Sequence, residues 1–258
     1  MSEGTVRLAA EAPIAKVLLD APPENRLTPA LVAALASTIS RVDGNSDVRA
    51  AILSGWGGTF SSGMDLRTLE ALEPKPLLLA AQLGQDVAWR IEHSEKVWVA
   101  AVEGVARGGG LDLALACDLL VAADDARFES PEVGEGWIPF FGGTQRLPRL
   151  VGAGWASEMI LTGEMIDAAT AERIGLVNRV TRPEELLPQA RAIARKIVEK
   201  APRAVALSKA AIHMALEASL SAGLSFETEA FGLAGATADK GEGMAAFLEK
   251  RKPAFKNE

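Results

Sequence analysis

The sequence predicts an α/β core followed by a helical C-terminal region. Four short apolar runs, flanked by glycine, proline or acidic residues, are typical of buried strands, and they span 14–19, 50–53, 97–102 and 119–123. Helical patterns lie between these runs, and such an alternation is typical of α/β proteins. From about Glu184 onward no strand-like run remains. We therefore expect the last quarter of the chain to be helical.

The four runs are apolar at nearly every position, which indicates burial of both strand faces and largely parallel pairing. The first helix is expected over 29–42, because Thr28 is a good N-cap and Pro29 then takes the first helical position. The C-terminal helical patterns span 186–200, 203–216, 226–237 and 243–250. Since no repeat or low-complexity linker separates them, we expect one core, residues 1–190, with residues 191–258 as a helical appendage.

The composition is that of an ordinary globular protein, with 258 residues, 48% of them hydrophobic and 24% charged. The net charge of −7 argues against nucleic-acid binding, so any anion site needs a local basic cluster. The single cysteine, Cys117, lies in an apolar run and is interpreted as a buried, inert thiol. No apolar run is long enough to span a membrane and the N-terminus lacks a signal-peptide pattern, so we expect no membrane association and a cytoplasmic location.

Residues 102–118 carry the strongest local signal, because a strand leads through Gly108, Gly109 and Gly110 into a helical apolar pattern. Glycines let a backbone approach a ligand closely, and the free N–H groups at a helix start favour an anion or oxyanion. The run lacks the Lys and Ser or Thr of a phosphate loop and the spaced glycines of a dinucleotide site. Taken alone, it predicts a ligand loop or a tight strand-to-helix turn equally well.

Two acids accompany this loop. Asp112 follows Gly109 by three residues, so on a helix its carboxylate lies on the same face as that glycine's N–H. Its neighbours are apolar, which fits either a first-turn acid favoured by the helix dipole or a buried acid kept for chemistry. Glu132 is the second acid, and its alternative interpretation is a solvated loop charge. Two acids in unlike environments are able to divide general-acid and general-base roles.

Motifs along nearly the whole chain resemble the enoyl-CoA hydratase/isomerase (crotonase) family. They occur in family order at 60–66, 101–110, 116–118, 130–132, 142–147, 161–163, 171–178 and 247–255. The resemblance implies a crotonase-like spiral of ββα units, with an acyl-CoA site in residues 1–190 and a helical trimerisation region in residues 191–258. It also implies a homotrimer or a dimer of trimers acting on an acyl-CoA thioester.

The family holds the thioester oxygen with two backbone N–H groups, and the matching positions here are Met64 and Gly109. Enolate charge collects on that oxygen, and one well-placed donor contributes about 3 to 4 kcal/mol to its stabilisation. By the same resemblance, further residues are expected to contact the substrate: Ser62, Gly63, Asp65, Leu66, Gly108, Trp137, Phe140, Arg26, Phe247 and Lys250. Arg26 and Lys250 are the candidates for the CoA tail, Lys250 with the alternative that it reaches a neighbouring subunit's site.

In the family's hydratases two glutamates flank a water molecule, and the matching positions hold Asp112 and Glu132. Asp112 is one methylene short, which withdraws its carboxylate by roughly 1.5 Å, and displacements of that size cost about a hundredfold in rate. Phe140 stands where hydratases commonly have glycine and is expected to crowd the water. Dienoyl-CoA isomerases also carry Asp at the Asp112 position, but they place a second Asp where this chain has Phe140. Trp137 and Phe140 have the alternative role of core aromatics.

The leading hypothesis is an enoyl-CoA hydratase, a lyase in which Glu132 donates a proton and Asp112 orients and activates water. The second is an isomerase that uses Glu132 alone, and the third is a catalytically degenerate CoA-binding homologue. No metal or redox cofactor is expected, because the only histidines, His93 and His213, show no ligand spacing. Apolar positions such as Ile193, Ile212 and Leu207 in the C-terminal region favour self-association over a small appendage burying them alone.

Overall fold

Six strands form the main sheet in the order β1-β2-β3-β4-β6-β9 in the computed structural model, which describes residues 4–257. Their bounds are Thr5–Glu11, Ile14–Asp20, Ala50–Gly55, Val97–Val102, Leu119–Ala123 and Arg179–Thr181. The β1 and β2 strands pair antiparallel, and every later neighbour in this sheet pairs parallel. The four predicted strands and their mainly parallel pairing are therefore confirmed.

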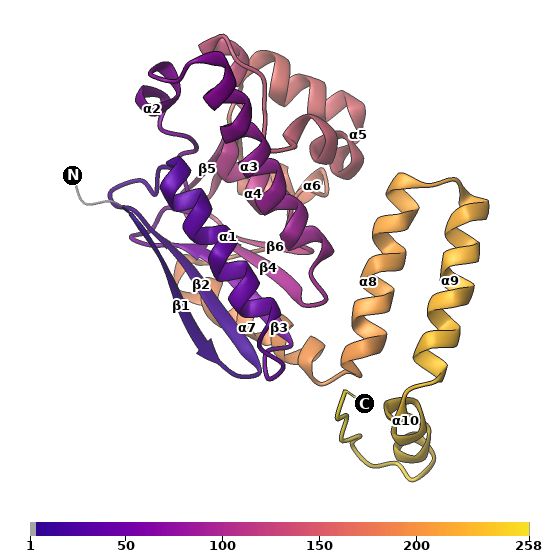
Figure 1. The fold of residues 1–258 in the computed structure, drawn as a ribbon. Helices are drawn as coiled ribbons and strands as arrows, with labels where there is room; N and C mark the ends of the chain where they lie inside the picture. Colours follow the sequence, from indigo (N-terminus) through magenta and orange to yellow (C-terminus); the bar gives the residue numbers. More distant parts are fainter. Residues whose placement is uncertain (1–3, 258) are drawn as a thin grey trace.

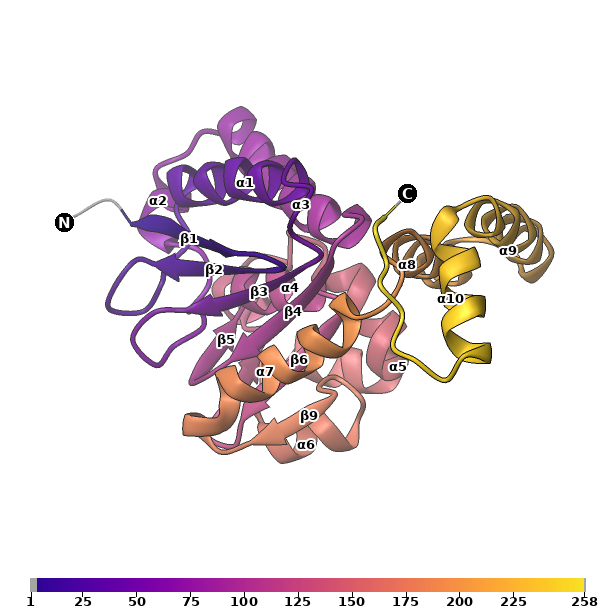
Figure 2. The same ribbon diagram turned by 90° about the horizontal axis from the view of Figure 1, so that it is seen from below.

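Both faces of the sheet are covered, which explains why its strands are apolar at nearly every position. In β3, Ala51 and Leu53 belong to the larger core, which also contains α1 (Pro29–Asp43) and α3 (Pro74–His93) residues. Ala50 and Ile52 face the other side, where they pack with α7 (Pro183–Val198). Figure 2 shows α1 and α3 on one side of the strands and α7 on the other.

The helix α1 begins as the sequence predicts. Thr28 has extended backbone angles, its side chain accepts a hydrogen bond from the Leu31 N–H, and Pro29 occupies the first helical position. Leu31, Leu35 and Ile39 then fall on one buried face at helical spacing. This cap and stripe fix the helix against the sheet.

A second, smaller sheet carries the site. It contains β5 (Val105–Arg107), β7 (Arg127–Glu129) and β8 (Ile166–Asp167). The helix α4 (Gly109–Leu115) follows β5 almost at once, and the 3-10 helix η1 (Glu132–Glu135) follows β7. Since β5 and β7 pair parallel, their C-terminal ends place α4 and η1 at the same edge.

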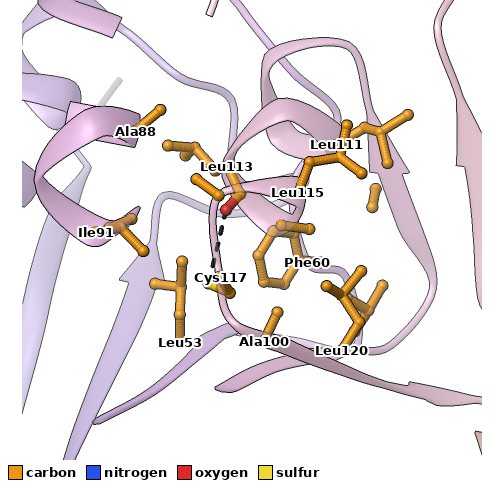
Figure 3. Packing of buried hydrophobic residues seen from close by; sticks show 14 of the residues in the cluster. Leu53, Phe60, Ala88, Ile91, Ala100, Leu111, Leu113, Leu115, Cys117 and Leu120 are labelled. Carbon is orange, nitrogen blue, oxygen red and sulfur yellow. Dashed lines mark hydrogen bonds between the residues drawn. The ribbon is translucent and has the colours of Figure 1, made fainter. Parts of the chain in front are cut away.

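The interior beneath α4 is densely apolar (Figure 3), with Phe60, Leu113 and Leu120 around Cys117. The Cys117 thiol is buried, donates to the Leu113 carbonyl at 3.6 Å, and has a pKa raised mainly by burial. Cys117 is therefore the inert core thiol that the sequence predicts.

The remaining helices, in chain order, are α2 (Leu66–Glu70), α5 (Gly143–Thr162), α6 (Ala168–Arg173), α8 (Pro202–Glu217), α9 (Leu220–Gly235) and α10 (Ala238–Leu248). Figure 1 shows α8, α9 and α10 as an arm beside the core. The predicted division at residue 190 falls inside α7, whose Ala190 and Ala194 both pack on the sheet. In residues 4–257 no helix is long and apolar enough to cross a membrane.

Candidate active site

Two chain segments meet at the edge of the smaller sheet. The backbone of Phe60 and Ser61 runs beside β5, because Ser61 N donates to Val105 O at 2.9 Å and Arg107 N donates to Ser61 O at 3.0 Å. The segments stay close beyond the strand: a Cβ on Gly63 would lie 2.6 Å from Arg107 O, and one on Gly110 would lie 2.6 Å from Ser61 O. Any side chain at either glycine would push the segments apart.

This close approach places Met64 beside Gly109, and a Cβ on the preceding Gly63 would lie 3.5 Å from Gly109 N. A Cβ on Gly109 would lie 3.6 Å from Met64 Cγ. Gly109 is the first residue of α4, so its N–H has no partner within that helix. Leu27 N donates to Gly63 O, and Leu27 O accepts from Asp65 N, so neither bond uses the Met64 N–H. Among residues 4–257, the structure thus leaves two neighbouring N–H groups unbonded, which is the requirement for an oxyanion hole.

Glu132 lies at the start of η1 and is almost fully buried. Ser130 Oγ donates to Glu132 Oε2 at 2.8 Å, and a Cβ on Gly108 would lie 3.0 Å from Glu132 Oε1. Burial raises the pKa of this carboxyl above its ordinary value, although the Ser130 hydroxyl opposes the shift. Glu132 is therefore a partly desolvated acid beside the glycine loop, and the alternative of a solvated loop charge is wrong.

Asp112 lies in the first turn of α4 with 3% of its surface exposed. Phe141 N donates to Asp112 Oδ2 at 3.1 Å, and the Gly143 N–H donates to the same carboxylate. A Cβ at position 143 would lie 2.1 Å from Asp112 Oδ1, so any residue larger than glycine there would displace the carboxylate. Burial, followed by the nearby charge of Glu132, raises the pKa of Asp112 to about 7, and the two N–H groups act against that rise. Asp112 is able to exist in both protonation states near neutral pH.

A narrow cavity opens between the two loops and η1. It is lined by Ser62, Gly63, Met64, Leu66, Leu69, Arg107, Gly108, Gly109, Pro131, Glu132, Glu135, Trp137 and Phe140. Most of the predicted substrate contacts are therefore gathered at one place. Ser62 lines the cavity, and its hydroxyl oxygen is buried with no hydrogen-bond partner in the described part of the chain. Asp112 lies behind this lining, held by the loop at Phe141.

Four predicted contacts lie elsewhere in the protomer. Asp65 caps α2 by accepting from Arg67 N, and Arg26 forms an exposed ion pair with Glu24. Phe247 and Lys250 lie at the end of α10, in the arm and away from α2 and β5 (Figure 1). Neither residue lines the cavity of its own protomer, and the alternative that the C-terminal segment reaches a neighbouring subunit's site stays a prediction.

Several supporting residues were not predicted from the sequence. Asn25 is fully buried with φ of 51°, its amide donates to Trp56 O and Thr59 O, and its carbonyl accepts from Ser61 Oγ. Arg107 bonds both Glu129 and Glu135, which fastens η1 to β5. Both residues act through partners more than twenty positions away in the sequence, so no local pattern predicts either role.

A wider apolar groove lies between α8 and the core, lined in part by Cys117, Leu120, Leu176 and Ile212. It contains neither Asp112 nor Glu132. His213 borders it, with Nδ1 3.7 Å from Glu92 Oε1 and Nε2 3.6 Å from Asp118 Oδ1, and it stacks with His93 at a centroid separation of 6.1 Å. Among the described residues no cluster of three potential metal ligands occurs.

The site combines two neighbouring backbone N–H groups with two buried carboxyl groups. The chain belongs to the enoyl-CoA hydratase/isomerase family, whose sequence model matches residues 9–258. A crotonyl-CoA hydratase from Syntrophomonas wolfei is 46% identical over 86% of this chain and 85% of that protein. A short-chain-enoyl-CoA hydratase from Clostridium acetobutylicum is 42% identical over 100% of both chains.

Solved structures of enoyl-CoA hydratases have the same fold. An enoyl-CoA hydratase from Bacillus anthracis superposes with a TM-score of 0.95 at 35% identity, covering 98% of this chain and 100% of the other. An enoyl-CoA hydratase from Geobacillus kaustophilus gives 0.96 at 33% identity, covering 100% and 98%. The crotonase-like fold expected from the sequence motifs is therefore confirmed.

Proposed function

We propose that this protein is an enoyl-CoA hydratase that adds water across the 2,3 double bond of an enoyl-CoA thioester. The observation that carries the proposal is the pairing of two unbonded N–H groups with a buried carboxyl group in one cavity. The two curated relatives described above, named as hydratases of crotonyl-CoA and of short-chain enoyl-CoA, support it.

The amides of Met64 and Gly109 receive the thioester oxygen. Attack at the β carbon moves electrons onto that oxygen, and a preorganised donor contributes about 3 to 4 kcal/mol to stabilising the resulting enolate. The Met64 side chain is incidental to this role, because the N–H group makes the bond.

The two acids complete the addition. The water oxygen bonds to the β carbon, Glu132 protonates the α carbon, and the proton lost by water returns to the acid pair. Asp112 orients and activates the water and the buried Glu132 is the proton carrier, so the pair works while its two carboxyl groups hold one proton between them. Raised pKa values in both carboxyl groups suit acid–base work near neutral pH. The mechanism needs no metal or redox cofactor.

An isomerase is the second candidate. Asp112 is tied by two backbone N–H groups and does not line the cavity, whereas Glu132 and Phe140 do. Glu132 alone would then move a proton between two carbons while Phe140 excludes water. The third candidate is a CoA-binding homologue that has lost catalysis. The retention of two buried acids counts against it.

Direct assay separates the three functions. The purified protein is mixed with crotonyl-CoA, and loss of the conjugated double bond is followed by absorbance; a 3-enoyl-CoA is tested in parallel for gain of conjugation. A hydratase consumes the first substrate with formation of the 3-hydroxyacyl product. Conversion of only the 3-enoyl substrate would establish the isomerase, and binding without turnover of either would establish the degenerate homologue.

We also propose a closed homo-oligomer, a trimer or a dimer of trimers. The arm exposes large apolar side chains that its own core does not cover, namely Leu220, Phe231, Phe247 and Leu248, each at least 77% exposed. Ile212 is also exposed, whereas Ile193 packs on the sheet. A second protomer covering these positions would bring the region around Phe247 and Lys250 to a neighbouring CoA site.

A further inference from the structure

Helix α3 packs against the apolar side of the loop at 140–143, whose backbone bonds Asp112. The Phe141 ring is fully buried and lies against Gly84, where an added Cβ would come within 1.9 Å of the ring. Gln85, one residue on, donates to the Phe140 carbonyl at 3.1 Å. The loop at 140–143 therefore packs closely on α3, at a position where any residue larger than glycine would overlap the Phe141 ring.

Arg146 grips the polar side of the same loop. Its Nη1 donates to the Phe141 carbonyl at 3.0 Å, and a Cβ on Gly142 would lie 2.0 Å from that nitrogen. Its Nη2 donates to Glu92 Oε2 on α3 at 2.6 Å, and both side chains of this pair are mostly buried. The planar guanidinium thus joins α3 to the loop, a double contact for which arginine is suited.

Arg146 bonds the peptide between Phe141 and Gly142, which lies between the two peptides whose N–H groups bond Asp112. Phe141 offers its carbonyl to Arg146 and its N–H to Asp112 Oδ2, and the N–H of Gly143 completes the carboxylate's environment. Arg146 is therefore connected to Asp112 through the loop backbone at Phe141. Movement of its guanidinium would move both donors to the carboxylate.

We propose that Arg146 is a positioning residue for Asp112, fixing the Phe141 and Gly143 N–H groups that aim and polarise its carboxylate. The assignment rests on the proposed hydration, in which Asp112 orients the water. The charged groups around Asp112 are Glu132 from η1, which raises its pKa, and Arg146 from α5, which lowers it. Glu92 and, beyond it, His213 face Arg146 from α3 and α8.

A purely structural tie between α3 and α5 is the competing explanation, and it predicts an effect on stability alone. The variant R146Q removes the charge, and R146K keeps it while losing the planar fork. The matched control is R149Q on the same helix, because Arg149 contacts Gln145 and Leu216 and does not touch the loop.

The test measures kcat and KM for crotonyl-CoA hydration against pH in all three variants. In parallel, the Asp112 carboxyl is titrated by carbon-13 NMR of aspartate-labelled protein, with its signal assigned from D112N. For R146Q we expect kcat to fall about tenfold to a hundredfold with little change in KM. We also expect the Asp112 midpoint, and with it the fall of kcat at high pH, to move upward by about one pH unit.

R146K should keep most of the titration midpoint and lose about fivefold in kcat. The assignment is overturned if the midpoint in R146Q stays within about 0.3 of wild type, or if R149Q shows the same shift. If R146Q does not fold, an R146K protein equal to wild type in kcat also overturns it. A wild-type protein that hydrates no enoyl thioester would refute the proposed function instead, while the NMR titration would still decide the role of Arg146.

Discussion

Replacing Asp112 with asparagine should change how the stability of the protein depends on pH. The carboxyl is buried and its pKa is raised from 3.8 to about 7 in the folded state. A group with a raised folded pKa favours folding while it is protonated, and this contribution is lost as pH rises through the folded value. Ionised Asp112 therefore destabilises the native protein above neutral pH, whereas an asparagine at this position carries no charge.

The size of the effect follows from the two pKa values. A pKa difference of one unit corresponds to about 1.4 kcal/mol, so the full interval is worth about 4 kcal/mol. Between pH 5 and pH 8, the free energy of unfolding of D112N relative to wild type should rise by about 2.5 kcal/mol. The amide meets one N–H donor with its own NH₂ group, but this cost is independent of pH and does not alter the slope.

Guanidinium unfolding at equal protein concentration, followed by circular dichroism at several pH values, measures this difference. The matched control is D47N, the same change at an exposed loop aspartate. A difference between D112N and wild type that stays constant within about 1 kcal/mol across this range would refute the inferred burial cost.

Three further outcomes are expected. The hydration rate should fall as pH rises through about 7, because ionisation of Asp112 removes the last proton from the acid pair and Glu132 then has none to deliver, and a pH profile of kcat that is flat from 6 to 8 would contradict this role. The variant S130A should raise the pKa of Glu132 further, because the Ser130 hydroxyl bonds its charged form, and carbon-13 NMR of glutamate-labelled protein should show the higher midpoint, whereas an unchanged midpoint would count against that bond. Sedimentation at micromolar concentration should show a trimer or hexamer, given the exposed Phe231 and Leu248, and a monomer would rule out the proposed assembly.

The sequence predicts the main sheet well because its strands obey a strong physical constraint. Val97–Val102 and Leu119–Ala123 are buried on both faces, so nearly every position must be apolar and the limits of the strands are visible. The antiparallel β1 escapes such detection, since most of Thr5–Glu11 is exposed. The three short strands of the second sheet are held by a few tertiary contacts and leave no periodic pattern.

The site, too, is predictable from the sequence only where its residues are close together along the chain. Gly109 and Asp112 stand close together in sequence, so helical geometry alone predicts that they share a face. The bonds from Phe141 and Gly143 to Asp112 join residues about thirty positions apart, and no local pattern announces them. Family motifs supply the missing link for Met64, because they identify a backbone role that its side chain does not reveal.

Glu132 provides the most direct test of the proposed mechanism. In E132Q, hydration of crotonyl-CoA should fall by about a thousandfold or more, because an amide is unable to deliver and recover the proton. Binding should persist through the Met64 and Gly109 amides, so calorimetry with a saturated short-chain acyl-CoA should give a Kd close to that of wild type. An E132Q protein that keeps most of the wild-type rate on crotonyl-CoA would show that another residue carries the proton.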